Sequence, residues 1–219
     1  MKDLRPIRGR QYILDCIAQG EHQQQDFKYA ISDARKIARS ISAFANCEGG
    51  HLLVGVKDSG AIAGVRNEED VYVIEQAAQL YCRPAQEVEF TAFNTGETGI
   101  VIRARIAKSP VRAVMAQEPD LSWRAYWRVA DENIAAHPLQ VRAWQREADG
   151  TAETMSLDGI EMALLRHVSA QAPVPIETAI RALPCSRQTA EAAIVRLASM
   201  RLLAFSFTPS RGFSLLLPE

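Results

Sequence analysis

The chain has 219 residues, which is enough for one large domain or two small ones. Its hydrophobic fraction of 47% is ordinary for a packed globular protein and excludes disorder as the main state. The formal net charge of −1 excludes a molecule that attracts nucleic acid over its whole surface, so any anion-binding site must be a local patch.

Cysteine and histidine residues give no metal-binding spacing. The four cysteines are far apart and form no Cys-x-x-Cys pair, which argues against a zinc knuckle, and the four histidines are likewise scattered. The N-terminal segment has charges but no long apolar core, and no run approaches the roughly 18 apolar residues of a membrane span. These features predict free thiols in a cytoplasmic protein with no membrane partner.

The first part of the chain mixes helix and strand patterns. Apolar residues recur with the period of a helix in the segments 10–19, 32–46, 68–82 and 138–146. Patterns typical of strands occupy the segments 51–56, 61–65, 87–93, 99–107 and 124–130. The continuous apolar run 51–56 is typical of a strand buried on both faces, and 61–65 follows it as a hairpin partner. Arg103 and Arg105 alternate with apolar residues and are predicted to point outward.

The second part of the chain has a different order of elements. The polar segment 147–153 contains a glycine and is typical of a linker. Beyond it the patterns predict three helices followed by two strands, which is the order of a winged helix, a variant of the helix-turn-helix. The sequence therefore predicts two domains, an α/β domain over 1–148 and a winged-helix domain over 154–219.

Residues 21–64 contain the run SAFANCEGGHLLVGVKDSGAIAG, which resembles the Schlafen/AlbA-type family. Members share Phe-Lys, a helix ending in Ser-Ala-Phe-Ala-Asn, a Gly-Gly pair and a Gly-Val-x-Asp strand end. A weaker likeness continues at 109–110 and 126–129. The resemblance implies an α/β (α+β) domain with a mixed sheet that binds nucleic acid, either DNA or structured RNA. It also implies a transcriptional regulator, which many bacterial members extend with a C-terminal domain.

In animal Schlafens the resemblance implies more, namely a metal-dependent endoribonuclease that acts on structured RNA such as tRNA. The three acidic residues of that activity fall on Glu21, Asp26 and Asp58, and Lys28 falls on the family's lysine position. Three carboxylates with water and phosphate could hold Mg²⁺ or Mn²⁺. Such a metal polarises a phosphoryl oxygen and activates water.

One substitution argues against this catalysis. The second acid is usually Glu in relatives, and the shorter Asp26 withdraws the carboxylate by about 1.5 Å, one C–C bond. Catalytic ligand sets tolerate about 0.5 Å of misplacement. The alternative is that the acids form surface ion pairs with nearby lysine and arginine, and that Asp58 only forms a turn.

Basic residues near aromatic ones are candidates for contacts with single strands or RNA. In the first domain such a sheet face would contain Arg103, Arg105, Arg112, Arg124 and Arg128, beside Trp123, Tyr126 and Trp127. The alternative is that any half-exposed sheet carries arginine at alternate positions. Separately, Lys28 and either Arg35 or Arg39 could neutralise charge that grows on a bound phosphate. In the second domain Arg187 and Arg211 could touch phosphates or bases. Residues 151–219 hold six arginines and six acids, however, and that balance fits a dimerisation module, and thus a homodimer, equally well.

The segment 50–57 has a superficial likeness to a phosphate-binding loop. It lacks the adjacent Gly-Lys-Ser/Thr, and its glycines flank a strand, so close backbone packing is their predicted role and ATP hydrolysis is not supported. Three functions remain open: a nucleic-acid-binding regulator, a metal-dependent endoribonuclease, and an interaction module that only oligomerises.

Overall fold

The structure is a computed structural model, and it describes residues 4–65, 69–96, 99–111, 113–148 and 156–218. The chain divides into two compact units, Met1–Ala135 and Ala136–Glu219. Within the described ranges, no helix has both the length and the apolar sequence that crossing a bilayer requires.

The first unit is built on a mixed sheet, as the sequence predicts. Its helices are α1 (Arg10–Gln19), α2 (Ala34–Asn46) and α3 (Glu69–Leu80). The five-stranded sheet has the order β1 (Ile7–Arg8), β5 (Val88–Asn94), β6 (Ile100–Ile106), β3 (Gly50–Val54) and β2 (Gln25–Lys28). β1 and β2 run parallel to their neighbours β5 and β3, whereas β6 is antiparallel to both of its neighbours.

A second sheet of four strands completes this unit. It contains β4 (Cys82–Arg83), β7 (Met115–Gln117), β8 (Trp123–Val129) and β9 (Glu132–Ala135), all paired antiparallel. The prediction of an α+β domain with a mixed sheet is therefore confirmed.

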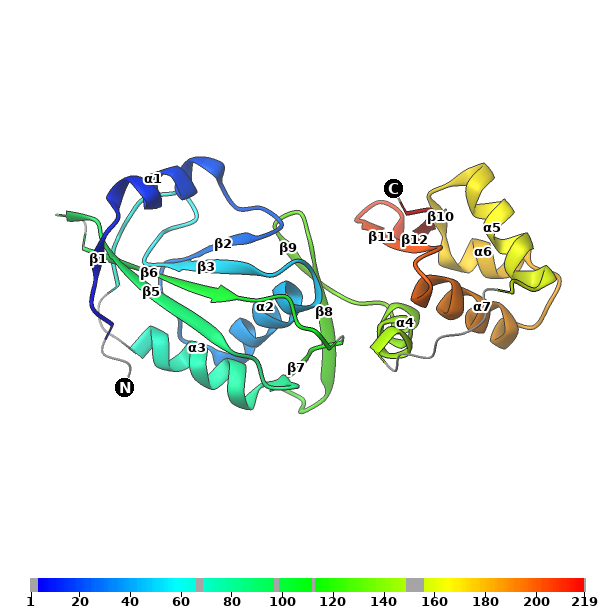
Figure 1. Cartoon of the computed structure of the whole chain (residues 1–219), viewed down its shortest axis with the longest axis horizontal. Helices are drawn as coiled ribbons and strands as arrows, with labels where there is room; N and C mark the ends of the chain where they lie inside the picture. The colour runs from blue at the N-terminus through cyan, green and yellow to red at the C-terminus, as the bar shows by residue number, and fades with distance from the viewer. Residues whose placement is uncertain (1–3, 66–68, 97–98, 112, 149–155, 219) are drawn as a thin grey trace. The chain divides into compact units, whose positions relative to one another are not determined.

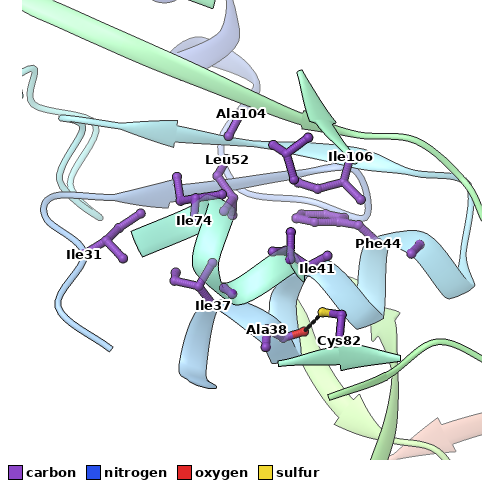
Figure 2. Close-up of a cluster of buried hydrophobic side chains, with 14 of the residues drawn as sticks. Ile31, Ile37, Ala38, Ile41, Phe44, Leu52, Ile74, Cys82, Ala104 and Ile106 are labelled. Atoms are coloured by element: carbon purple, nitrogen blue, oxygen red, sulfur yellow. Dashed lines mark hydrogen bonds between the residues drawn. The ribbon is translucent and has the colours of Figure 1, made fainter. Parts of the chain in front are cut away.

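Helices cover both faces of the five-stranded sheet, with α1 on one face and α2 and α3 on the other (Figure 1). In β3, Leu52 faces the core shared with α2, and Leu53 faces the core shared with α1. Figure 2 shows Ile41 and Phe44 of α2 packed beside Leu52 and Ile106 of the sheet. The prediction that this strand is buried on both faces is confirmed.

Helix α2 also packs against the four-stranded sheet, through polar side chains. Ser42 Oγ donates to Val114 O (2.8 Å) and accepts from Tyr126 N (3.0 Å). Asn46 Nδ2 donates to Val114 O and Tyr126 O (both 2.8 Å), and its Oδ1 accepts from Val114 N (2.7 Å). Ser42 lies off the apolar stripe of the sequence pattern and is nevertheless fully buried, because the second sheet covers that side of the helix.

Two glycines between α2 and β3 have structural roles. Gly49 has a φ of +77°, a left-handed conformation that side chains disfavour. A Cβ on Gly50 would lie 2.3 Å from Phe44 Cδ1 and 2.8 Å from Gln24 O. The predicted role of the glycines around β3, close packing of the backbone, is confirmed for Gly50.

In its described residues, the second unit contains four helices and a small sheet. Its elements are α4 (Pro138–Ala148), α5 (Gly159–Gln171), β10 (Val174–Pro175), α6 (Ile176–Ala182), α7 (Arg187–Ser199), β11 (Ala204–Thr208) and β12 (Gly212–Leu216). The strands pair antiparallel in the order β10-β12-β11. The side chains of Asp158 and Ser186 cap α5 and α7.

The predicted boundary between the domains is wrong by one helix. Leu139 and Ala143 of α4 are buried in the core of the second unit, beside Leu164 and Ile194. The first domain therefore ends at Ala135 and not at residue 148. Of the predicted linker 147–153, residues 149–153 lie outside the described ranges.

The structure also corrects the predicted strands. The segment 61–65 is not a strand, because only an isolated bridge joins Val56 to Ile62. The short strands β1, β2, β4, β7, β9 and β10 have no signal in the sequence pattern. Among them β2 is important, since it carries Asp26 and Lys28.

Candidate functional site

Strand β2 positions the first two of the predicted acidic residues. A tight turn precedes it, in which His22 and Gln25 exchange backbone hydrogen bonds of 3.0 and 3.1 Å. Asp26 and Lys28 then lie on the same side of the strand, and Lys28 Nζ is 2.8 Å from Asp26 Oδ2. The side chain of Glu21 contacts the strand, where its Oε1 accepts a hydrogen bond from Phe27 N (2.8 Å).

Glu21 and Asp26 form a carboxyl pair. Asp26 is 5% exposed and Glu21 is half-buried. Burial raises the pKa of Glu21, and a hydrogen bond with Asp26 raises it further, whereas the amide of Phe27 acts in the opposite direction. The ion pair between Asp26 and Lys28 is formed, as one of the two interpretations of the sequence predicts, although it is largely buried and not on the surface.

Asp58 lies on an exposed turn after β3. In the described ranges, no group of three or more His, Cys, Asp or Glu side chains is placed to hold a metal ion. Asp26 is also occupied by cations, Lys28 at 2.8 Å and Arg128 at 3.7 Å. The three carboxylates therefore do not fit a Mg²⁺ or Mn²⁺ centre as the structure has them.

A pocket of about 470 Å³ opens where β2, α2 and the β8–β9 hairpin meet. It brings together four of the predicted site residues, Asp26, Lys28, Arg39 and Arg128, and adds Lys36 from the first turn of α2. These residues are up to about a hundred positions apart in the chain, and the packing of α2 between the two sheets assembles them.

Arg128 is the most deeply buried cation at this pocket, at 2% exposure. Its Nη2 donates to Gln25 O (3.1 Å) and its Nη1 donates to Asn133 Oδ1 (3.0 Å). Its guanidinium lies 5.0 Å from the centre of the Phe44 ring. Arg128 therefore ties the four-stranded sheet to the start of β2, and its main role is structural.

Arg39 is held by a carboxylate that the sequence pattern does not reveal. Its guanidinium donates to both carboxylate oxygens of Glu118, and Tyr126 Oη donates to Glu118 Oε1 (2.6 Å). Burial and this hydrogen bond to Glu118 raise the pKa of Tyr126 to about 12. The hydrogen bond that Arg39 donates to Glu118 likewise raises the pKa of Arg39. Glu118 lies in a loop with no periodicity, so only the folded chain reveals this partner.

Arg103 and Arg105 of β6 do not reach the pocket. Arg103 is half-buried against α1, where its Nη1 donates to Tyr12 Oη (2.7 Å). Arg105 is exposed and pairs with Glu89 (2.8 Å). The prediction that both arginines point outward from a half-exposed sheet is therefore wrong for Arg103, because α1 covers that face.

The predicted basic face with interleaved aromatic residues is divided in the structure. Arg35 stacks on the ring of Tyr81 at 4.7 Å. Arg124 is exposed on β8, whereas Arg103 and Arg105 belong to the other sheet. Arg112 lies outside the described residues.

In the second unit the two candidate arginines differ. Arg187 begins α7 and pairs with both oxygens of Glu177 (2.8 and 2.7 Å) and with Glu191 (2.8 Å). Arg211 is exposed in the turn between β11 and β12. The guanidinium of Arg187 is therefore paired with carboxylates of the same chain. A helix-turn-helix would present this group to DNA at the start of its third helix.

Comparison with known proteins completes the description. No curated protein matches this sequence. Among solved structures, the DIP2311 protein from Corynebacterium diphtheriae is similar at 19% sequence identity and a TM-score of 0.46. The match covers 94% of this chain and 37% of that one, so the chain spans little more than a third of that protein's length. The family model described as Schlafen, AlbA_2 matches residues 21–137, more than half of the chain, and the chain belongs to this family.

Proposed function

We propose that the chain binds nucleic acid and that the pocket between β2, α2 and the β8–β9 hairpin is the contact site. The observation that carries this proposal is the convergence of four cations, Lys28, Lys36, Arg39 and Arg128, on one pocket. Membership of the Schlafen, AlbA_2 family supports a nucleic-acid-related function. Three carboxylates, Asp26, Asp131 and Glu132, line the same pocket, so binding relies on the cations that they leave unpaired.

The cations differ in how freely they can meet a phosphate. Arg39 and Arg128 are fixed by Glu118 and by backbone groups, so they supply positive potential from set positions. Lys36 is exposed, and no hydrogen bond or ion pair holds its side chain within the described ranges. Lys36 is therefore the first residue expected to pair directly with a phosphate oxygen.

We propose that the second unit is a winged-helix domain and that it assists the nucleic-acid binding of the first unit. Its order of helices, followed by a hairpin that joins a third strand, supports this assignment. Arg187 is occupied by Glu177 and Glu191, which favours dimerisation over DNA reading for this unit. In this proposal the chain acts as a cytoplasmic regulator of transcription, and its binding alone, without cleavage, blocks or marks a site.

Binding is tested by fluorescence anisotropy with a labelled single-stranded RNA, a structured RNA and a duplex DNA, each at about 50 and 200 mM salt. We expect binding that weakens as salt rises, because each phosphate contact releases counterions. Lys36→Ala should weaken binding several-fold. Lys108→Ala is the matched control, because Lys108 is an exposed lysine of the same unit that pairs with Glu48 away from the pocket. The absence of binding to all three polymers at low salt would refute the proposal.

A second candidate, the metal-dependent endoribonuclease, is favoured by one observation. Glu21 and Asp26 lie together, and Asp26 lines the pocket. Incubation of tRNA with Mg²⁺ or Mn²⁺, with and without chelator, tests this activity. Cleavage that chelator and Asp58→Ala both abolish would establish it, and cleavage that survives Asp58→Ala would reject the three-carboxylate site. The third candidate, an interaction module alone, is excluded if light scattering shows a monomer that still binds RNA.

A further inference from the structure

We infer that the pocket takes a single unpaired nucleotide, with its phosphate on the α2 side and its base against the β8–β9 turn. This inference rests on the proposed function and makes it more specific. The residues that carry it are Lys36 of α2 and Asp131 and Glu132 of the β8–β9 hairpin. None of these three is a candidate from the sequence.

The size of the pocket suits one nucleotide. Its volume of about 470 Å³ falls in the range of roughly 300–1,000 Å³ that small-ligand sites occupy. A paired base is stacked inside a helix and cannot enter such a pocket, whereas a base in a loop or bulge can be turned out of the stack. The ligand class is therefore an unpaired nucleotide within a longer strand.

Hydrogen bonds connect the three elements that line the pocket, so its shape does not depend on a bound ligand. Asn133 Nδ2 donates to Ser40 Oγ (2.9 Å), which joins β9 to α2. Asn133 Oδ1 accepts from Arg128 Nη1 (3.0 Å), and Arg128 is itself bound to the backbone of β2. All three elements that form the pocket are thus connected, and a ligand need not order them on binding.

Cations and carboxylates both line the pocket, and those without a partner in the described ranges come from different elements. Lys36 comes from α2, and Lys28 comes from β2, where it pairs with Asp26 (2.8 Å). Asp131 comes from the turn between β8 and β9, and Glu132 begins β9. In the described ranges no hydrogen bond or ion pair engages the side chains of Asp131 and Glu132, and both are exposed. This turn includes Ala130 at a φ of +53°, an uncommon conformation for a residue with a side chain.

This arrangement of charge selects among bases. An ionised carboxylate only accepts hydrogen bonds, so it favours a base edge that presents N–H donors. Guanine offers two adjacent donors on its Watson–Crick edge, whereas uracil offers one N–H between two carbonyl oxygens. We therefore assign the pocket a preference for an unpaired guanine over an unpaired uracil.

The experiment uses RNA hairpins that differ only in one bulged nucleotide: guanine, uracil, or no bulge. Affinities are measured by anisotropy with the full chain. We expect the guanine bulge to bind about tenfold more tightly than the uracil bulge, the effect of one good base contact. Asp131→Asn combined with Glu132→Gln should reduce this ratio to near one while binding persists. Glu87→Gln, an exposed carboxylate outside the pocket, is the matched control.

The outcomes separate this inference from the proposed function. If all hairpins bind equally and the double variant changes nothing, the nucleotide pocket is refuted and general nucleic-acid binding stands. If no hairpin and no other nucleic acid binds, the proposed function fails as well. If the guanine preference survives the double variant, another part of the chain reads the base, and the assignment to Asp131 and Glu132 is wrong.

Discussion

Replacement of Asn46 by alanine removes three of the polar contacts that join α2 to the four-stranded sheet. Asn46 is 2% exposed, and its side chain makes three hydrogen bonds to the backbone of Val114 and Tyr126, at 2.7, 2.8 and 2.8 Å. Val114 O keeps its bond from Ser42 Oγ in the variant. The Val114 amide and the Tyr126 carbonyl lose the Asn46 partner and stay buried against the helix.

The expected loss of stability follows from these two groups. A buried backbone group deprived of its partner costs about 1–3 kcal/mol, so the two together cost about 2–6 kcal/mol. Domains have unfolding free energies of about 5–15 kcal/mol. Asn46→Ala should therefore remove a large share of the stability of the first unit and leave the second unit unchanged.

Urea denaturation followed by circular dichroism measures this loss, and hydrogen exchange assigns it to one unit. Amides of β8 should exchange faster in Asn46→Ala, whereas those of α5 should not change. The matched control is Asn94→Ala, which removes a single exposed bond to Gly96 N (2.8 Å). A loss for Asn46→Ala below about 1 kcal/mol, no larger than that of the control, would show that these bonds do not hold the sheet to the helix.

Three further predictions concern single positions. Gly50→Ala should destabilise the first unit by about 1–3 kcal/mol in urea denaturation, because the new methyl group would meet Phe44 and the backbone, and an unchanged midpoint would contradict this. Ala130→Gly should raise the unfolding free energy by about 1 kcal/mol, because glycine adopts a φ of +53° without strain; a decrease would contradict it. Burial and then the charge of Arg103 lower the pKa of His51 to about 4, so only the unfolded chain binds this proton between about pH 6.5 and 4. Stability should fall across that window as pH falls, by on the order of 2 kcal/mol after allowance for partial exposure, and His51→Gln should lose less between pH 7.5 and 5.

Local patterns in the sequence predict the long elements well. Helix α1 is predicted at its observed residues, because its apolar spacing and Gly20 are both local signals. Strand β2 is not predicted, since its four residues contain one apolar side chain and its conformation depends on pairing with β3. The helix at α4 is predicted, but its periodicity does not say which core buries Leu139. The strand that pairs with β2 and the core that buries Leu139 are both determined by the tertiary structure, which local patterns do not contain.

The same distinction applies to the candidate site. The resemblance to a family points to Asp26 and Lys28, and the structure places both at the pocket. It cannot point to Lys36, Asp131 or Glu132, because no motif contains them and only the approach of α2 to the β8–β9 hairpin brings them together. Asp58 shows the converse, since it occupies a motif position, lies on an exposed turn and completes no metal-binding group with Glu21 and Asp26 in the described ranges.

The burial of α2 between two sheets has a consequence for how relatives of this chain are interpreted. Three residues of the family signature hold α2 against the two sheets: Ser42, Asn46 and Gly50. A chain that keeps these three residues has kept an architecture, and it is free to exchange the side chains that surround the pocket. Relatives with the same signature can therefore differ in what they bind, and the residues that correspond to Lys36 and Asp131 are where such divergence is expected.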